Sequence, residues 1–168
     1  MNVWVLFYQL LPVTLALFGV TLMILSPTPR QLGLGIKWGF LSLILAIIFD
    51  LIAVNLGIWT YPMDELTWNI PLPIYFLSTL IYSCIVYTGV LKIFKHAPIT
   101  FWLLIVSIPV LGILRNYWGG TFFAPDLVSW NTSWWFVFDF IGWSFAYVLP
   151  IIPMLGDYQK RASADITA

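Results

Sequence analysis

The chain has 168 residues, of which 61% are hydrophobic and only 8% are charged, and its formal net charge is zero. A soluble domain carries roughly 25% charged residues, so this composition, with a mean hydropathy of +0.96, excludes an ordinary soluble globular domain. We interpret the chain as an all-α integral membrane protein with a single domain, because no stretch remains for a separate soluble core.

Five apolar runs are long enough to span a bilayer as helices, which takes about 20 residues each. They cover residues 3–25, 38–60, 72–94, 99–118 and 133–156. The first run lacks a basic leader and a cleavage motif, so we expect it to belong to the mature protein. The sequence predicts a five-helix transmembrane bundle over residues 1–156, followed by a short, frayed cytoplasmic tail over 157–168.

Basic residues in the connectors predict the orientation of this bundle, because Lys and Arg collect on the cytoplasmic side. Five spans place only Arg115 on one side. The other side holds Arg30, Lys37, Lys92, Lys95, Lys160 and Arg161. We therefore expect the N-terminus outside and the C-terminus in the cytoplasm. The long connector over 118–132 is either a surface loop or a re-entrant turn.

Asp50 is an acid within the second apolar run, where an aspartate costs about 2.5–3.5 kcal/mol. If that run ends near Trp59, the carboxylate lies roughly 15 Å deep, close to the bilayer centre. The residues that share its helix face are small, as on a face that packs against another helix. They are Gly39, Ser42, Ala46, Ala53 and Gly57. Asp50 is therefore expected to point into the bundle, either as a structural residue or as part of a site.

Asp139 repeats this pattern in the last run, about 9 Å below the outer end if that helix begins near Ser133. Arg115 closes the fourth run on the same outer side. The two acids and the arginine are candidate catalytic residues, since intramembrane ionisable groups mark functional sites. An ion pair between Arg115 and one acid for stability is the alternative, although it leaves the second acid without a partner.

Aromatic residues are the other candidates, as a substrate-binding set or as membrane-interface anchors and packing residues. The outer-interface set is Trp59, Tyr61, Trp68, Trp118, Trp130, Trp134 and Trp135. The candidate substrate-binding residues are Trp59, Tyr61, Tyr75, Tyr82, Trp135 and Trp143. Tyr75 and Tyr82 lie in the third run, where hydroxyl groups also bond to their own backbone or to neighbouring helices.

The segment around Asp50 resembles the lycopene cyclase domain found in heterodimeric carotenoid cyclases. The resemblance covers about residues 38–80: an Asp within a span, then "GIWTY" over 57–61, a short loop, and a proline that opens the next span. The family carries a Pro-x-Glu-Glu motif there, whereas this chain reads "PLPIYF" over 71–76 and lacks both glutamates. The resemblance implies the family's membrane fold, a carotenoid or isoprenoid ligand, and a prokaryotic cytoplasmic or photosynthetic membrane.

Two functions follow as hypotheses. The first is a cofactor-independent isoprenoid or terpene cyclase, an isomerase in which Asp50 or Asp139 delivers a proton and the other acid, with Arg115, assists. The second is a non-catalytic carotenoid-binding protein or small subunit beside a membrane-protein partner or another copy of itself. No nucleic-acid-binding patch is evident, and His96 and Cys84 have no companions at metal-ligand spacing, so we expect neither cofactor nor metal.

The predicted topology is tested with reporters fused to the C-terminus or inserted at Glu65 or Asp126. The C-terminal fusion is expected to be active in the cytoplasm and both insertions on the opposite side, because the basic residues fix the orientation. A C-terminal reporter active outside the cytoplasm would contradict this topology.

Overall fold

A computed structural model describes residues 2–94, 97–118 and 127–167, with the side chains of Pro98 and of residues 161–167 excepted. Some of the sequence expectations fall outside the described residues. They concern Lys95, His96, Asp126 and the greater part of the 118–132 connector. Five long apolar helical stretches are found: α1 (Val3–Leu25), α2 (Pro29–Asn55), α3 (Leu72–Ile93), α4 (Pro98–Trp118), and the run from Trp135 to Lys160. Each is long and apolar enough to cross a membrane, as predicted.

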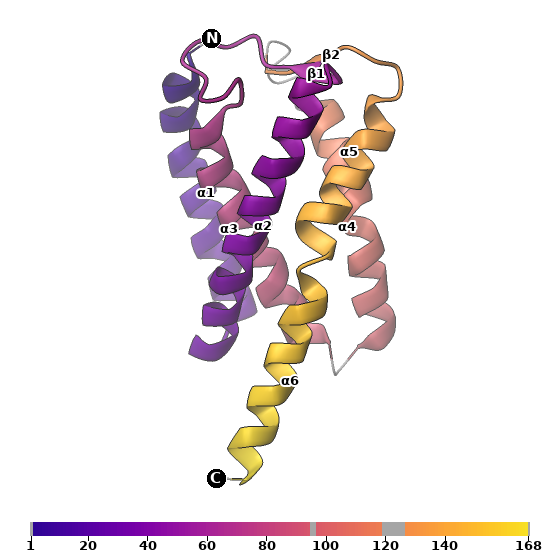
Figure 1. Ribbon diagram of the computed structural model, residues 1–168. Helices are drawn as coiled ribbons and strands as arrows, with labels where there is room; N and C mark the ends of the chain where they lie inside the picture. The colour runs from indigo at the N-terminus through magenta and orange to yellow at the C-terminus, as the bar shows by residue number, and fades with distance from the viewer. Residues whose placement is uncertain (1, 95–96, 119–126, 168) are drawn as a thin grey trace.

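The helices run up and down as a bundle, with the two termini at opposite ends (Figure 1). Helix α2 packs most extensively on α3, and α1 covers α3 from the periphery. A two-stranded antiparallel ladder closes the end of the bundle at which α1 begins (Figure 1). It joins β1 (Trp59–Thr60) to β2 (Ser129–Trp130), with Trp59 opposite Trp130. The connectors after α2 and α4 are thereby tied together.

Helix α2 begins nine residues earlier and ends five residues earlier than the predicted span over 38–60. It begins at Pro29 because Thr28 and Gln31 form a capping box, with Pro29 at the first helical position. Gly35, which lies before the predicted span, packs closely on α3, because a Cβ at this position would lie 2.8 Å from Thr88 Oγ1. The helix ends at Asn55 because Gly57 adopts a φ of +69° after it, a conformation that glycine favours.

This earlier end changes the position of Asp50 within its helix. The carboxylate lies five residues before the end of α2, about 7.5 Å along the helix, whereas the predicted span placed it roughly 15 Å from the end. Asp139 lies four residues after the start of α5 (Trp135–Trp143), about 6 Å from that end. The two acids are therefore at nearly the same level of the bundle.

The last span is interrupted in its middle, which the sequence pattern did not indicate. Helix α5 continues as the π-helix η2 (Ser144–Val148) and then as α6 (Ile151–Thr167). Pro150 has no N–H group, so the carbonyl of Ala146 has no helical donor four residues later. The hydroxyl of Tyr87 in α3 donates to the carbonyl oxygens of Tyr147, at 3.0 Å, and Ala146, at 3.4 Å. This side chain is fully buried and fixes the interruption in place.

The expected frayed tail is instead helical, because α6 continues to Thr167 and projects past the other helices (Figure 1). Its first part is fixed to α2 by two contacts. Lys37 forms an ion pair with Asp157, and the guanidinium of Arg30 donates to the carbonyl of Tyr158 and lies 5.5 Å from the centre of its ring. After Gly156 no glycine or proline follows to end the helix.

Replacing Tyr87 by Phe is expected to lower the free energy of unfolding by about 1–3 kcal/mol, because buried carbonyl oxygens lose their donor. The measurement is unfolding in detergent micelles. The matched control is Tyr8→Phe, since Tyr8 is 66% exposed. Equal effects of the two substitutions would contradict the role of Tyr87 at the interruption.

Candidate functional site

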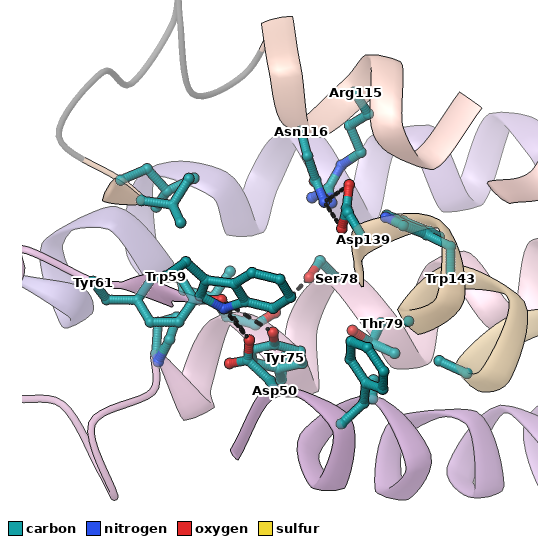
Figure 2. A pocket seen from close by; sticks show the side chains of 18 of the residues that line it. Asp50, Trp59, Tyr61, Tyr75, Ser78, Thr79, Arg115, Asn116, Asp139 and Trp143 are labelled. Carbon is teal, nitrogen blue, oxygen red and sulfur yellow. Dashed lines mark hydrogen bonds between the residues drawn. The ribbon is translucent and has the colours of Figure 1, made fainter. Parts of the chain in front are cut away.

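A cavity of about 210 Å³ lies inside the bundle beneath the β1–β2 ladder. Helices α2, α3, α4 and α5, the π-helix and the two connectors all contribute to its wall. Figure 2 shows that acids, aromatic rings and hydroxyl groups from these separate elements point toward one another. The lining consists of Ala46, Phe49, Asp50, Trp59, Tyr61, Pro71, Ile74, Tyr75, Ser78, Thr79, Arg115, Asn116, Leu127, Val128, Trp130, Asp139, Gly142, Trp143, Ala146 and Tyr147.

Asp50 is 2% exposed and accepts two hydrogen bonds on the same oxygen (Figure 2). The indole Nε1 of Trp59 donates to Oδ1 at 2.7 Å, and the hydroxyl of Tyr61 donates to it at 2.9 Å. The other oxygen, Oδ2, is buried and has no hydrogen-bond partner among the described residues. Asp50 thus lines the cavity with a carboxyl group whose second oxygen is buried and unpaired, so that this oxygen can hold a proton.

Tyr61 connects Asp50 to the third helix. Its hydroxyl lies 3.3 Å from the hydroxyl of Tyr75, within hydrogen-bond distance. Burial, and after it the nearby Asp50 carboxyl, raise the pKa of the Tyr61 phenol well above its ordinary value near 10. Tyr61 consequently keeps its proton at neutral pH and remains a hydrogen-bond donor to Asp50.

Asp139 is 6% exposed and has a different hydrogen-bond environment. The side-chain amide of Asn116 donates to both of its oxygens, at 2.9 Å to Oδ1 and 3.1 Å to Oδ2. Arg115 donates to the Oδ1 atom of the same Asn116 at 3.3 Å. The amide oxygen of Asn116 faces the guanidinium of Arg115, and its amide nitrogen faces the carboxylate of Asp139. Asn116 therefore links Arg115 to Asp139.

This arrangement replaces the direct ion pair between Arg115 and an acid that the sequence left open. Among the described residues, no salt bridge joins Arg115 to either aspartate. The guanidinium instead lies over two rings, 5.5 Å from the centre of Tyr82 and 5.8 Å from that of Trp143.

Most of the predicted aromatic residues line the cavity, namely Trp59, Tyr61, Tyr75 and Trp143. Two do not. Tyr82 lies under the guanidinium of Arg115, and the ring of Trp135 stacks on that of Trp130 with centres 4.3 Å apart. The expected interface belt is accordingly divided: Trp59 is buried, whereas Trp68, Trp118 and Trp134 are exposed at that end of the bundle.

Sequence reasoning missed Asn116, Trp130 as a lining residue, and Tyr147. For Tyr147 a signal was present, because Asp139, Trp143 and Tyr147 recur at intervals of four and follow one helix face. The ring of Tyr147 stacks on Trp143 with centres 4.6 Å apart. Nothing in the local pattern pointed to Asn116, since its partner is 23 positions away in sequence.

Two glycines permit the helices to approach each other around the cavity. A Cβ on Gly112 of α4 would lie 2.2 Å from the indole of Trp143, and a Cβ on Gly142 of α5 would lie 2.6 Å from the ring of Phe49. Neither position accepts a side chain without moving an aromatic residue of the cavity wall. The wall therefore depends on small residues in the helices behind it.

No metal centre is formed within residues 2–94, 97–118 and 127–167, where no three His, Cys, Asp or Glu side chains cluster at ligand distance. Comparisons with protein-family models, with curated proteins and with solved structures gave no match. Inference about function therefore depends on the chemistry of the cavity.

A double-mutant cycle tests how Asp139 is held. Asn116→Ala and Asp139→Ala together are expected to cost less than the sum of the single substitutions, with a coupling of about 1.5–3 kcal/mol for hydrogen bonds to a charged group. Arg115→Ala and Asp139→Ala should couple more weakly, because they do not touch. The measurement is the free energy of unfolding in detergent micelles, and a larger coupling for the Arg115 pair would overturn this geometry.

Proposed function

We propose that the cavity receives the unsaturated end of an isoprenoid, such as a carotenoid, and that Asp50 starts its cyclisation by protonating a double bond. The observation that carries the proposal is the free Oδ2 atom of Asp50. The hydrogen bonds from Trp59 and Tyr61 both go to Oδ1, so the unpaired Oδ2 is the atom on which a proton can be held for transfer to the ligand.

The walls suit the cation that such a transfer creates. A carbocation near the face of an aromatic ring, within about 6 Å of its centre, is stabilised electrostatically, and more so where water is excluded. Trp59, Trp143 and Tyr147 are among the aromatic residues that line the cavity. Their hydrophobic packing is a sufficient reason for their burial, so the rings support the proposal without carrying it.

Asp139 is the candidate for the final step. In the proposed reaction the Asp50 O–H bond breaks as a C–H bond forms, and the π electrons of a second double bond close the ring. A proton is then lost from a carbon beside the cation to the Asp139 carboxylate. One proton is delivered and one removed, so the product is an isomer of the substrate and no cofactor is needed. Two hydrogen bonds from Asn116 hold the Asp139 carboxyl group in a fixed position, as this role requires.

The size of the cavity limits what it can contain. Apolar cavities of about 150 Å³ bind benzene, so about 210 Å³ is enough for one ring-sized end group. A whole carotenoid is far larger. The ligand class is therefore a long isoprenoid of which one end enters, or a short one bound entirely.

The resemblance to the lycopene cyclase domain is part of this proposal. In that family glutamates follow the proline that opens the span, and here the corresponding stretch includes Ile74, which lines the cavity. Asp50 and Asp139 are the carboxyl groups available in place of those glutamates. The chemistry would then use acids from α2 and α5 instead of α3.

A second candidate is a binding protein without catalysis, which holds the end of a carotenoid or isoprenoid for a membrane-protein partner or as a homo-oligomer. The feature that favours it is the replacement of both glutamates by the apolar sequence "PLPIYF" over 71–76. In this reading Asp50 serves to hold Trp59 and Tyr61, and its hydrogen bonds are structural.

Replacing Asp50 by Asn separates the two candidates, because it retains the shape and removes the ionisable proton. In a lycopene-producing host, the cyclase proposal expects new ring-bearing pigments with the natural chain and their loss with Asp50→Asn, at unchanged protein abundance. Glu65→Gln is the matched control, since Glu65 is exposed on the connector. Pigment analysis by chromatography is the measurement.

Unchanged lycopene with the natural chain, together with lycopene that copurifies with it, would favour the binding function. If Asp50→Asn fails to accumulate, Asp50→Glu retains an acid and should restore cyclisation. A folded, fully active Asp50→Asn variant would remove the proton-donor role.

A further inference from the structure

We infer that a ligand reaches the cavity sideways from the lipid, between α2 and α5, through an entrance that the ring of Phe49 closes. This inference rests on the proposed function for its ligand, an isoprenoid with one end in the cavity. It adds the route by which the ligand enters. It also adds a second binding surface, for the part of the isoprenoid that the cavity cannot hold.

Phe49 forms the wall at this point. Its side chain lines the cavity and is half-buried, so it has one side toward the cavity and another toward the exterior. It lies on α2 next to α5 and η2, which contact α2 along this edge (Figure 1). The ring packs against Gly142, where a Cβ would lie 2.6 Å from it. Because Gly142 has no side chain, movement of the Phe49 ring leaves nothing else to fill the gap.

The inner side of this wall leads to the reactive acid. The ring of Phe49 contacts that of Trp59, with centres 6.3 Å apart, and Trp59 donates to Asp50. A chain end that displaces the Phe49 ring therefore arrives beside Trp59, the residue that donates to the Asp50 carboxyl group.

The outer side leads to an apolar hollow. The ring of Phe49 also contacts that of Phe145, with centres 6.4 Å apart. Phe145 lines a shallow hollow of about 390 Å³ along α5, η2 and α6. Its other lining residues are apolar except Ser144. The hollow runs past the π-helix, so the interruption of the last span contributes to its shape.

We assign the hollow to the chain of the isoprenoid whose end group occupies the cavity. The cavity of about 210 Å³ holds one ring-sized end group, so the rest of a long ligand must pass out of it. The aromatic pair Phe49–Phe145 is the point at which the cavity and the hollow meet. An apolar chain is also dissolved in the bilayer, and a path from the lipid leads it to the cavity without passing through the ladder end of the bundle.

The entrance is tested in liposomes by photolabelling with adamantyl diazirine, a small apolar probe that dissolves in the bilayer. Labelled residues are mapped by mass spectrometry. Phe49→Ala is expected to raise labelling of the cavity residues Tyr75, Thr79 and Tyr147 several-fold, and Phe49→Trp to lower it. The matched control is Ile48→Ala, an exposed neighbour that should leave cavity labelling unchanged. Phe49→Leu replaces Phe49→Ala if the latter does not fold.

The position of the isoprenoid's hydrocarbon chain is tested by measuring which residues a bound isoprenoid protects from labelling by the same probe. Geranylgeraniol is expected to protect both the cavity and Phe145, whereas isoprenol, with five carbons, should protect the cavity alone. Cavity labelling that is equal in the Phe49 variants and the control would overturn the entrance. Protection of the cavity without Phe145 by geranylgeraniol would overturn the assignment of the hollow.

These outcomes are independent of catalysis, because labelling requires no reaction. Asp50→Asn should leave labelling and protection as in the natural chain. A loss of ring formation with intact labelling would therefore concern the chemistry, and the reverse pattern would concern the entrance.

Discussion

The burial of the Asp50 carboxyl group in an apolar bundle is the constraint on which the site depends. An aspartate within a span costs about 2.5–3.5 kcal/mol, and an ordinary intramolecular hydrogen bond contributes about 0.5–1.5 kcal/mol. The two bonds from Trp59 and Tyr61 therefore offset much of that cost. Both donors come from the connector after α2, so the acid and the turn stabilise each other.

The conformation of this connector follows from the end of α2. Gly57 takes a positive φ, and the chain turns back so that Trp59 reaches Asp50 from outside the helix. The same residue then pairs with Trp130 in the β1–β2 ladder, and both residues line the cavity. A tryptophan that would serve as an interface anchor in an ordinary loop is thereby made part of the cavity wall.

The two acids lie at one level yet differ in their surroundings, and this difference is the main support for assigning them different roles. Asp50 has one oxygen without a partner, whereas Asp139 has both oxygens bound by Asn116 near the positive charge of Arg115. Pairs of acids with contrasting environments are typical of general acid–base sites. A purely structural role would explain each acid separately, but it would not explain why both face one cavity.

The sequence by itself determined the five long apolar helices, because runs of about 20 apolar residues with few charges are local properties, of the kind that a bilayer requires. It also indicated Asp50, Asp139 and Arg115, since ionisable residues are rare in such runs. The end of α2, by contrast, was misplaced, although Gly57 is a recognisable helix stop. Only the tertiary structure decided that Asn116 lies between Arg115 and Asp139, that Tyr87 holds the interrupted last span, and that Trp59 turns inward. These contacts join residues on different helices or a helix and a returning connector, and the packing of one element on another leaves no periodic signal along the chain.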